Sequence, residues 1–320
     1  MEGLIYMKKI FIDGAEGTTG LKIFERFKDR TDIEILKIDS ALRKDENEIK
    51  KFINNSDITF LCLPDAASAE AVKLVENPDT VIIDTSTAHR TAEGWTYGFP
   101  ELSSGQREII ASSKKIANPG CYATGFISLV YPLVSAGLLP KDYPVSCFAV
   151  SGYSGGGKKL IAQYTDAERD KKFGSARMYG WGQNHKHLKE MQVITGIEKE
   201  PLFSPLTTDY FSGMIVQIPL FTDLLTHKAS LEEVRDIYTE HYMGQKLISV
   251  MPLGAEAEQG NVIFSDEMSD RDDLRIYVTG NNDRIVVASS FDNLGKGASG
   301  AAIQNMNIVM GIDETTGLAL

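Results

Sequence analysis

Short apolar runs alternate with helix-forming segments along the first third of the chain. The apolar runs have the length of buried strands and lie at residues 10–13, 33–38, 57–63 and 80–84. The segments between them have helical periodicity or composition and lie at residues 21–27, 46–53 and 66–75. Strands that alternate with helices predict an α/β domain with a parallel, doubly wound sheet. Ligands of such a sheet bind beyond the carboxyl ends of its strands.

The pattern changes after residue 120, where a helix-forming run at 123–134 is followed by more widely spaced strands. These strands are expected at residues 143–151, 214–220, 246–251, 261–265, 274–279 and 283–290. Turn signals such as Asn281-Asn282-Asp283 separate them, so we predict a second α+β domain with a largely antiparallel or mixed sheet. A last helix at 301–310 is expected to pack on the first domain. The predicted domains are residues 7–120 with 298–320, and residues 121–297.

The composition excludes several functional classes. The 320 residues are 42% hydrophobic, and a formal charge of -11 argues against a general nucleic-acid binder. Three cysteines at 62, 121 and 147, without metal-ligand spacing, argue against a disulfide framework and give no metal site. No apolar run has the length of a membrane span, and the N-terminus lacks a signal-peptide core. Met7-Lys8-Lys9-Ile10 resembles a natural start after the leader Met1–Tyr6, and we expect a cytoplasmic protein.

A glycine-rich loop joins the first predicted strand to the first predicted helix. Its sequence is Gly14-Ala15-Glu16-Gly17-Thr18-Thr19-Gly20. Strand, glycine loop and helix are the context of a dinucleotide-binding turn, where glycines let the backbone approach a pyrophosphate at the helix N-terminus. We therefore predict that Gly14, Gly17 and Gly20 bind the cofactor, with hydroxyl donors from Thr18 and Thr19. The alternative is a plain tight turn.

The end of the second predicted strand bears on the choice between NAD and NADP. Asp39 stands where an acidic residue binds the ribose 2′-hydroxyl of NAD. Ser40 and Arg43, with Lys44, offer a hydrogen bond and positive charge to the 2′-phosphate of NADP. We favour NADP on these residues. The alternative is that Arg43 and Lys44 are solvated loop charges.

Cys121 follows Pro119-Gly120 and opens a helix-forming run. The unpaired N–H groups and the positive dipole end at a helix start stabilise a thiolate. Cys121 is therefore a candidate covalent nucleophile, and a small buried thiol in a turn is the alternative. Cys62 and Cys147 lie in apolar strands and are expected to be inert.

Several polar residues follow strand-like runs and are expected at the same sheet edge as the glycine loop. Pro64, Ser86 and Arg90 follow strand-like runs, as Cys121 does, and we predict cofactor contacts for Pro64 and Ser86. The turn at residues 151–159 contains three glycines in a row beside Ser and Lys. Its N–H groups suit an anion, and a flexible loop is the alternative.

A cysteine nucleophile with a dinucleotide suggests thiolate attack on an acyl group or aldehyde, coupled to hydride transfer. Such chemistry needs an acid or base that works near neutral pH, and histidine suits this role. His185 and His187 are the candidates, because they lie in a polar stretch before a helix. His227 and His241 lie in charged helical surroundings and are expected at the surface. His89 either assists Arg90 or has a structural role.

Six segments, in order and spanning residues 8–310, resemble N-acetyl-gamma-glutamyl-phosphate reductases of the shorter type. The two most specific are Asn118-Pro119-Gly120-Cys121-Tyr122-Ala123-Thr124 and Asn293-Leu294-Gly295-Lys296-Gly297-Ala298. The others are the glycine loop, residues 84–90, residues 151–157 and residues 185–190. The resemblance implies a glyceraldehyde-3-phosphate-dehydrogenase-like fold in the semialdehyde dehydrogenase superfamily. It also implies reduction of N-acetyl-glutamyl 5-phosphate by NADPH to the 5-semialdehyde and phosphate, in arginine biosynthesis.

The resemblance also implies roles for individual residues. Cys121 matches the family's nucleophile, which forms a thioester, and His185 matches its acid/base, with Glu190 placed to orient it. Lys186 replaces the arginine of longer members and the following Pro-Glu is missing, so His187 remains a rival to His185. The remaining roles are expectations for the mechanism. Arg90, Asn118, Ser154, Gly155 and His187 would contact substrate or its oxyanion, and Asn293, Lys296 and Gly297 would lie near the nicotinamide.

Other functions fit the same features. Within enzymes, aspartate-semialdehyde dehydrogenase and the reductase of carrier-bound aminoadipyl phosphate share this chemistry. A regulator that uses the first domain only to sense NADP is an alternative of another class. The expected partners are a small acyl phosphate or semialdehyde and phosphate, with no nucleic acid and no membrane, and a homodimer or homotetramer is expected.

Overall fold

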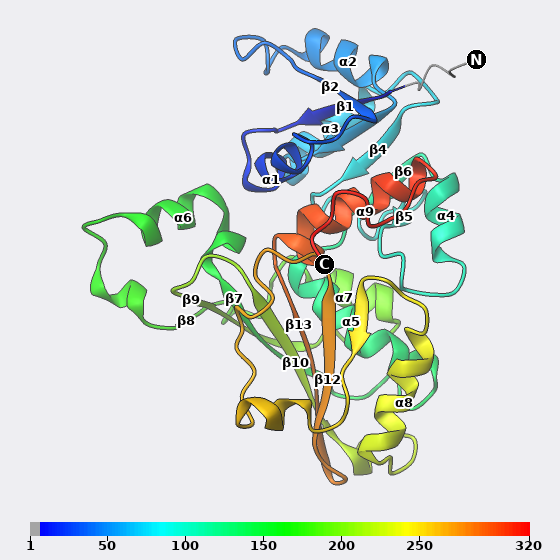
Figure 1. Cartoon of the computed structure of the whole chain (residues 1–320), viewed down its shortest axis with the longest axis vertical. Coiled ribbons are helices and arrows are strands. Elements are labelled where there is room, and N and C mark those ends of the chain that lie inside the picture. Colours follow the sequence, from blue (N-terminus) through cyan, green and yellow to red (C-terminus); the bar gives the residue numbers. More distant parts are fainter. Residues whose placement is uncertain (1–6) are drawn as a thin grey trace. The chain divides into compact units, whose positions relative to one another are not determined.

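The computed structural model describes residues 7–320, which divide into two compact units (Figure 1). Unit 1 contains the described residues up to Pro100, together with Gly105–Pro119 and Ala298–Leu318. Unit 2 contains Glu101–Ser104, Gly120–Gly297 and Ala319–Leu320. The leader Met1–Tyr6, predicted to precede the natural start, lies outside the described residues.

Unit 1 contains, among its described residues, a parallel six-stranded sheet with the order β2-β1-β3-β4-β6-β5. Its strands are β1 (Lys8–Asp13), β2 (Ile33–Leu36), β3 (Ile58–Leu61), β4 (Val81–Asp84), β5 (Thr96–Tyr97) and β6 (Lys115–Ala117). Its helices are α1 (Thr18–Arg26), α2 (Glu46–Asn55), α3 (Asp65–Lys73), α4 (Gln106–Ser112) and α9 (Gly300–Val309). Because β1 lies between β2 and β3, the chain changes direction across the sheet here. This switch point is where doubly wound sheets bind ligands.

Two hydrophobic clusters cover the two faces of this sheet. Alternate residues of β1 point to opposite faces, as a strand requires, so Ile10 and Ile12 join one cluster and Phe11 the other. The first cluster includes buried side chains of α1, α4 and α9. The second includes Ile53 of α2 and Ala71 of α3. The helix at the end of the chain therefore contributes to the core of the unit built by its beginning.

Unit 2 contains a mixed seven-stranded sheet with the order β11-β12-β13-β10-β7-β9-β8. Its strands are β7 (Ser146–Gly152), β8 (Arg177–Met178), β9 (Leu202–Thr208), β10 (Met214–Phe221), β11 (Ile248–Val250), β12 (Leu274–Asn281) and β13 (Arg284–Phe291). Its α-helices are α5 (Cys121–Ser135), α6 (Gly157–Thr165), α7 (Leu188–Thr195) and α8 (Leu231–His241). Its short helices are η1 (Tyr153–Gly156), η2 (Lys171–Gly174), η3 (Thr222–Leu224) and η4 (Ala255–Gln259), and η5 (Gly295–Ser299) begins in unit 2 and ends in unit 1. The predicted α/β fold with a parallel first sheet and a mixed second sheet is confirmed.

Helix α5 packs closely against the centre of the second sheet. A Cβ atom on Gly125 would lie 2.5 Å from Val216 Cγ2 and 2.8 Å from Phe291 Cε1. Val216 and Phe291 are themselves fully buried. Glycine at this position therefore allows the helix that begins with Cys121 to approach β10 and β13.

The prediction of a strand at residues 261–265 is wrong. Gly260 (φ 74°) and Asn261 (φ 60°) adopt left-handed backbone conformations after η4, so the chain turns and does not extend. Val262 and Phe264, whose alternation suggested a strand, are 44% and 61% exposed. Strand β9 was missed because Pro205 interrupts its apolar pattern.

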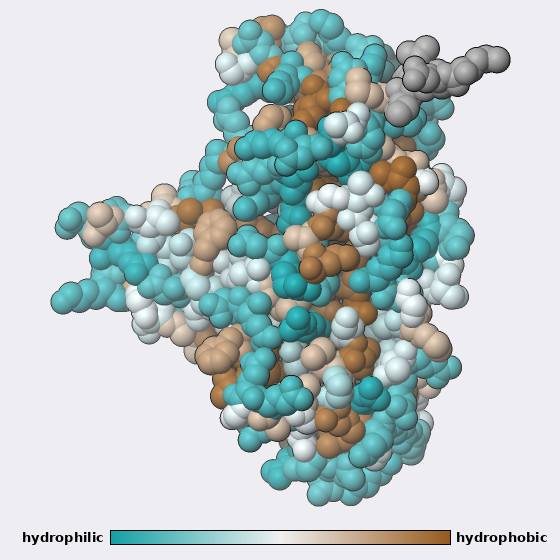
Figure 2. Space-filling model, viewed as in Figure 1, coloured by the Kyte–Doolittle hydropathy of each residue, from teal (hydrophilic) through white to brown (hydrophobic). Residues whose placement is uncertain are grey.

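Hydrophilic residues predominate on the face drawn in Figure 2, with hydrophobic ones in small groups between them. Among residues 7–320, no helix combines the length and the apolar character needed to cross a membrane. Within the same range, no group of three His, Cys, Asp or Glu residues is arranged to hold a metal ion.

Candidate active site

The glycine loop of unit 1 packs directly on the end of β3. Gly14 has φ +83°, and a Cβ atom there would lie 2.4 Å from the carbonyl oxygen of Cys62. A Cβ atom on Gly20 would lie 2.5 Å from the carbonyl oxygen of Gly14, which also accepts a hydrogen bond from the Gly17 N–H at 2.9 Å. Only glycine fits at positions 14 and 20 without moving the backbone.

The start of α1 fits an anionic group. Gly17 is the N-cap residue and has no side chain to cap the first N–H groups, and the first turn contains no acidic residue. The hydroxyl oxygen of Thr18 is buried, and it has no hydrogen-bond partner within the described chain. Open N–H groups, a positive dipole end and an unpartnered hydroxyl are what a pyrophosphate needs at this edge. The residues present therefore fit a dinucleotide.

The residues predicted to select NADP lie beside this loop. Arg43 forms an ion pair with Glu16, a residue of the glycine loop. Asp39 Oδ1 accepts a hydrogen bond from the Ala41 N–H at 2.8 Å, which fixes the turn that carries Ser40. Both partners of the Arg43 pair are exposed, so the guanidinium can exchange Glu16 for another anion at little cost.

A hydrogen-bond network around Asp84 follows the end of β4. The fully buried Asp84 carboxylate accepts from Ser68 Oγ at 2.8 Å and from Ser86 Oγ at 2.7 Å, and it contacts His89 Nδ1 at 2.6 Å. The His89 ring stacks on Trp95 with centroids 4.0 Å apart. The Ser86 hydroxyl is thus committed to Asp84, and Pro64 is the N-cap residue of α3. We did not predict Asp84 as a site residue, although the polar run that follows it was visible in the sequence.

Arg90 and Asn118 hold the segment that leads to Cys121. Arg90 Nε donates to the Asn118 carbonyl oxygen at 2.9 Å, and a terminal nitrogen donates to the Thr85 carbonyl oxygen at 3.0 Å. Asn118 Nδ2 donates to the Ala298 carbonyl oxygen at 3.0 Å, and Oδ1 accepts from Asn305 at 3.1 Å. With Asn118 only 1% exposed, both ends of its amide are used within unit 1.

Cys121 is the first residue of α5 and is half-buried. The N–H of the preceding residue, Gly120, donates to Glu190 Oε1 at 2.9 Å. A Cβ atom on Gly297 would lie 3.0 Å from Cys121 Cβ, so that glycine leaves room for the cysteine. Burial raises the pKa of the Cys62 thiol to about 12 and raises the pKa of Cys147 even further, so these two thiols are inert at neutral pH.

Two histidines and two aromatic residues lie next to the start of α5. The rings of His185 and His187 are perpendicular, with centroids 4.7 Å apart, and the His185 ring also contacts Tyr122 and Phe203. The His187 N–H donates to His185 Nδ1 at 3.2 Å. A neutral His185 ring therefore carries its proton on Nε2, where it can act as a donor.

Tyr122 and Tyr179 form a hydroxyl pair that sequence reasoning missed. Tyr179 donates to the Tyr122 hydroxyl at 2.8 Å. Burial raises the pKa of both phenols, Tyr179 to about 12, and negative charge at Cys121 raises them further. Both therefore remain protonated donors beside the cysteine. Tyr122 stands directly after Cys121 in the sequence, and this adjacency was the available signal.

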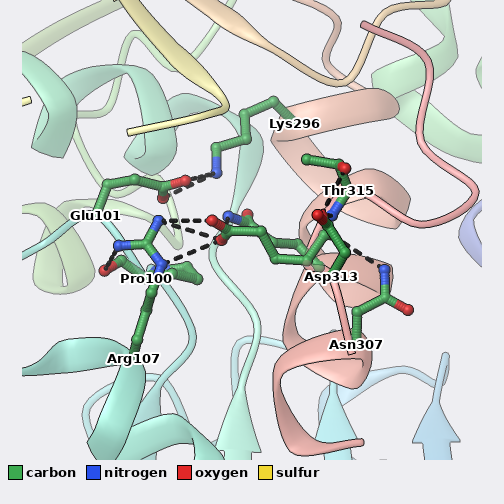
Figure 3. Close-up of polar contacts among 9 residues, drawn as sticks. Pro100, Glu101, Arg107, Lys296, Asn307, Asp313 and Thr315 are labelled. Atoms are coloured by element: carbon green, nitrogen blue, oxygen red, sulfur yellow. Dashed lines mark hydrogen bonds and ion pairs between the residues drawn. The ribbon is translucent and has the colours of Figure 1, made fainter. Parts of the chain in front are cut away.

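The remaining predicted residues form two buried polar contacts in unit 2, one made of hydrogen bonds and the other an ion pair. Asn293 Nδ2 donates to Ser154 Oγ at 2.9 Å and Asn293 Oδ1 accepts from the Gly213 N–H at 2.9 Å, beside Gly155. Lys296 Nζ contacts the two carboxylate oxygens of Glu101 at 2.8 and 2.9 Å (Figure 3). Both side chains of this ion pair are fully buried. Lys296 is therefore neutralised within unit 2.

Comparison with known proteins places both halves of the chain in one family. Residues 9–110 match the model "Semialdehyde dehydrogenase, NAD binding domain", and residues 121–293 match "Semialdehyde dehydrogenase, dimerisation domain". The chain is 48% identical over 307 residues to the N-acetyl-gamma-glutamyl-phosphate reductases of Brucella ovis and Brucella canis. That alignment covers 95% of this chain and 99% of each relative.

Solved structures share the fold at low sequence identity. Aspartate semialdehyde dehydrogenase from Francisella tularensis has a TM-score of 0.71 at 15% identity, over 95% of this chain and 100% of that chain. Aspartate semialdehyde dehydrogenase II from Vibrio cholerae has a TM-score of 0.70 at 15% identity, over 95% and 99% of the two chains. At this identity the likeness concerns the fold alone.

Proposed function

Since the chain belongs to the semialdehyde dehydrogenase family and, within it, to the N-acetyl-gamma-glutamyl-phosphate reductases, we propose its reaction on that premise. The protein reduces N-acetyl-glutamyl 5-phosphate with NADPH to N-acetyl-glutamate 5-semialdehyde and phosphate, a step of arginine biosynthesis. The observation that carries the proposal is the half-buried Cys121 at the start of α5, next to His185 and its aromatic neighbours, while the other two thiols are inert.

The Cys121 thiolate attacks the acyl carbon of the substrate. A carbon–sulfur bond forms, the carbon–oxygen bond to phosphate breaks, and phosphate leaves with the electron pair. The N–H groups at the start of α5 stabilise the oxyanion, since they point away from the helix and lack partners within it. Gly14, Gly17 and Gly20 with Thr18 and Thr19 would hold NADPH, which when bound would supply the hydride for reduction of the thioester.

His185 is the proposed acid/base, because its Nδ1 is occupied by the His187 N–H and its Nε2 carries the transferable proton. Its Nε2 proton passes to the alkoxide oxygen formed by hydride addition and returns to Nε2 as the carbonyl re-forms, and the carbon–sulfur bond then breaks so that the semialdehyde leaves and the thiolate is restored. Glu190, through Gly120, acts on the position of Cys121. Tyr122 and Tyr179 stay protonated, so neither phenol adds negative charge near the thiolate.

Arg90, Asn118, Ser154, Asn293 and Lys296 are proposed as positioning residues, because each uses polar atoms on neighbouring groups of its own unit. Direct substrate contact is proposed for Gly155 and His187. Pro64 and Ser86 remain proposed cofactor contacts at the edge of the first sheet.

We propose NADP as the cofactor on the basis of Ser40 and Arg43. Changing Arg43→Ala should lower kcat/KM for NADPH about tenfold or more, because a charged contact to the 2′-phosphate is lost. The same change should leave kcat/KM for NADH within about twofold, and Lys28→Ala, which changes an exposed lysine after the end of α1, is the matched control. Equal losses with both cofactors would contradict this assignment. An odd number of cysteines without disulfide spacing and an NADPH-dependent biosynthetic reaction support a cytoplasmic location.

A homo-oligomer is proposed from the second face of the unit 2 sheet. Phe148, Val150, Leu206 and Ile215 share that face by strand register and are only half-buried. A second copy that pairs through the same face would bury them by two-fold symmetry. Light scattering on the purified protein should give a dimer or tetramer, and Ile215→Arg should shift it to the monomer. A wild-type monomer would contradict this proposal.

The decisive test of the reaction is phosphate-dependent reduction of NADP by N-acetylglutamate semialdehyde. We expect this substrate to exceed aspartate and aminoadipate semialdehydes by about two orders of magnitude or more in kcat/KM. Cys121→Ser should abolish turnover while NADP binding persists, and Cys62→Ala is the matched thiol control. Near-normal turnover of Cys121→Ser would exclude the thioester. A failure of all three substrates would favour a regulator that only senses NADP.

A further inference from the structure

Unit 1 contains a pocket at the edge of its sheet opposite the glycine loop. Lys8 begins β1, Ile58 begins β3 and Val81 begins β4, and all three line a cavity of about 390 Å³. These strands are neighbours in the sheet and run parallel, so their first residues form one continuous edge (Figure 1). The glycine loop follows the other end of β1. Strands of 4 to 6 residues therefore separate the pocket from the cofactor edge by roughly 13–20 Å.

Charges of both signs line this pocket. The Lys114 ammonium donates to the Asp79 carbonyl oxygen at 2.9 Å, and Lys8 Nζ lies 3.3 Å from Asp57 Oδ1. Asp57 Oδ2 accepts the Lys9 N–H at 2.8 Å, so that carboxylate is held in place. The Asp79 carboxylate is exposed and has no hydrogen bond or ion pair to any residue of the described chain.

Two helices end at the pocket and add negative potential. Ala111 and Ser112 of the last turn of α4 line it, as do Val309 and Met310 at the end of α9. The last turn of neither helix contains a basic residue to balance its carbonyl groups. Together with the open Asp79 carboxylate, these helix ends favour a cationic group. Buried Ile58 and Val81 supply an apolar floor.

We propose that this pocket binds a small zwitterion, an α-amino acid with an aliphatic stem and a cationic end group. The cation lies against Asp79 and the two helix ends, the stem packs on Ile58 and Val81, and the α-carboxylate contacts Lys114. The cavity volume lies within the range of about 300–1,000 Å³ usual for small-ligand sites. Because the site lies at the amino end of the strands, its occupancy does not compete with NADP. The proposal does not depend on the reaction proposed above.

Isothermal titration of the full chain with L-arginine tests the proposal. We expect one site per chain, and affinity unchanged by saturating NADP. L-Citrulline, which lacks the cation, and agmatine, which lacks the carboxylate, should each bind about tenfold or more weakly, because each loses a charge-assisted contact. Asp79→Asn and Lys114→Met should each weaken the binding of L-arginine by the same factor. Lys115→Met, which changes the neighbouring exposed lysine outside the pocket, should not.

Three results would overturn the proposal. They are no heat of binding at millimolar L-arginine, loss of binding in the presence of NADP, and equal affinity in the Asp79→Asn, Lys114→Met and wild-type proteins. Each variant is first checked for normal NADP binding, which requires a folded unit 1. Asp79 is exposed and its carboxylate makes no hydrogen bond or ion pair within residues 7–320, so Asp79→Asn is expected to fold normally.

Discussion

Asp13 is the last residue of β1 and directly precedes the glycine loop. Burial raises the pKa of its carboxyl from the ordinary 3.8 to about 6, and a hydrogen bond from the Gly14 backbone opposes part of this rise. With 7% of its surface exposed, the group is poorly hydrated when ionised. Between pH 3.8 and 6 the folded chain keeps a proton that the unfolded chain has lost. Stability therefore falls as pH rises through this window, and the loss is complete above pH 6.

Changing Asp13→Asn should remove this pH dependence. The two pKa values, 3.8 and about 6, correspond to about 3 kcal/mol at most. The variant should therefore be more stable than the wild type by about 1–3 kcal/mol at pH 8 and equally stable below pH 3.8. Urea denaturation across this pH range measures the difference. Asp29→Asn, at an exposed turn, is the control, and a wild-type pH profile in Asp13→Asn would contradict the argument.

Glu190 holds the residue before Cys121 through one buried hydrogen bond to the Gly120 N–H. Glu190→Ala leaves that N–H without its acceptor, which costs about 1–3 kcal/mol, and it loosens the start of α5. We expect kcat to fall about tenfold or more, with a shifted pH profile for Cys121 alkylation by iodoacetamide. Glu190→Gln keeps an acceptor and should recover much of the loss.

A purely structural role for Glu190 predicts a different result. Stability would fall, but the alkylation profile of Cys121 would match the wild type in both variants. Glu190 lies in α7. Glu200→Ala, which changes an exposed carboxylate a few residues after the end of that helix, is the control for nonspecific charge effects.

At the scale of elements, α5 connects the core of unit 2 to the reactive cysteine. It has 15 residues and is buried along nearly its whole length, although Pro132 removes one helical hydrogen bond. Tertiary packing, not helix propensity, therefore stabilises it. Because Gly125 sets its distance from β10 and β13, the packing of this one residue governs where the helix start lies.

Gly125→Ala has two opposing effects on stability, and they differ in size. Alanine favours the helix by about 1 kcal/mol, but its Cβ atom would lie 2.5 Å from Val216 Cγ2, and overpacking costs about 1–3 kcal/mol. We expect net destabilisation and reduced turnover, measured by thermal unfolding and the phosphate-dependent assay. Val216→Ala in the same chain should relieve the contact and restore part of both. Gly174→Ala has open space around the new methyl group and is the control. A more stable Gly125→Ala protein would contradict this account.

For the whole molecule, the sequence predicted what depends on local pattern and left out what depends on distant partners. The alternation of strands and helices in residues 10–84 predicted the parallel sheet. The glycine spacing predicted a tight loop, and the backbone at Gly14 does require a glycine there. The acceptor of the Gly120 N–H, in contrast, comes from Glu190, 70 positions away. No period or motif encodes that pairing. The strand predicted at 261–265 was wrong because alternation of Val262 and Phe264 does not show that Asn261 turns the chain.

The Glu101–Lys296 ion pair is another long-range case, because its partners are 195 positions apart in the sequence. Glu101 opens a four-residue segment of unit 2 that is preceded and followed in sequence by unit 1, and Lys296 stands next to Gly297, where unit 2 passes into Ala298 of unit 1. Both side chains are fully buried, so each carries a desolvation penalty that the ion pair helps to offset. The pair therefore joins two segments of unit 2, each of which continues into unit 1 along the chain.

Removing one partner should cost far more than removing both. Lys296→Met leaves the buried Glu101 carboxylate without the ammonium that contacts both of its oxygens, and should lower the unfolding free energy by about 3–5 kcal/mol. Lys296→Met with Glu101→Leu replaces the pair by apolar groups and should recover most of that loss. Lys228→Met breaks an exposed ion pair with Asp283 and should change stability far less. Denaturation of the wild type, the two single variants Lys296→Met and Glu101→Leu, and the double variant gives the coupling energy, and a small effect of Lys296→Met would refute the structural role. If the folded double variant binds NADPH but fails to reduce substrate, Lys296 acts on the reaction itself and not through its position.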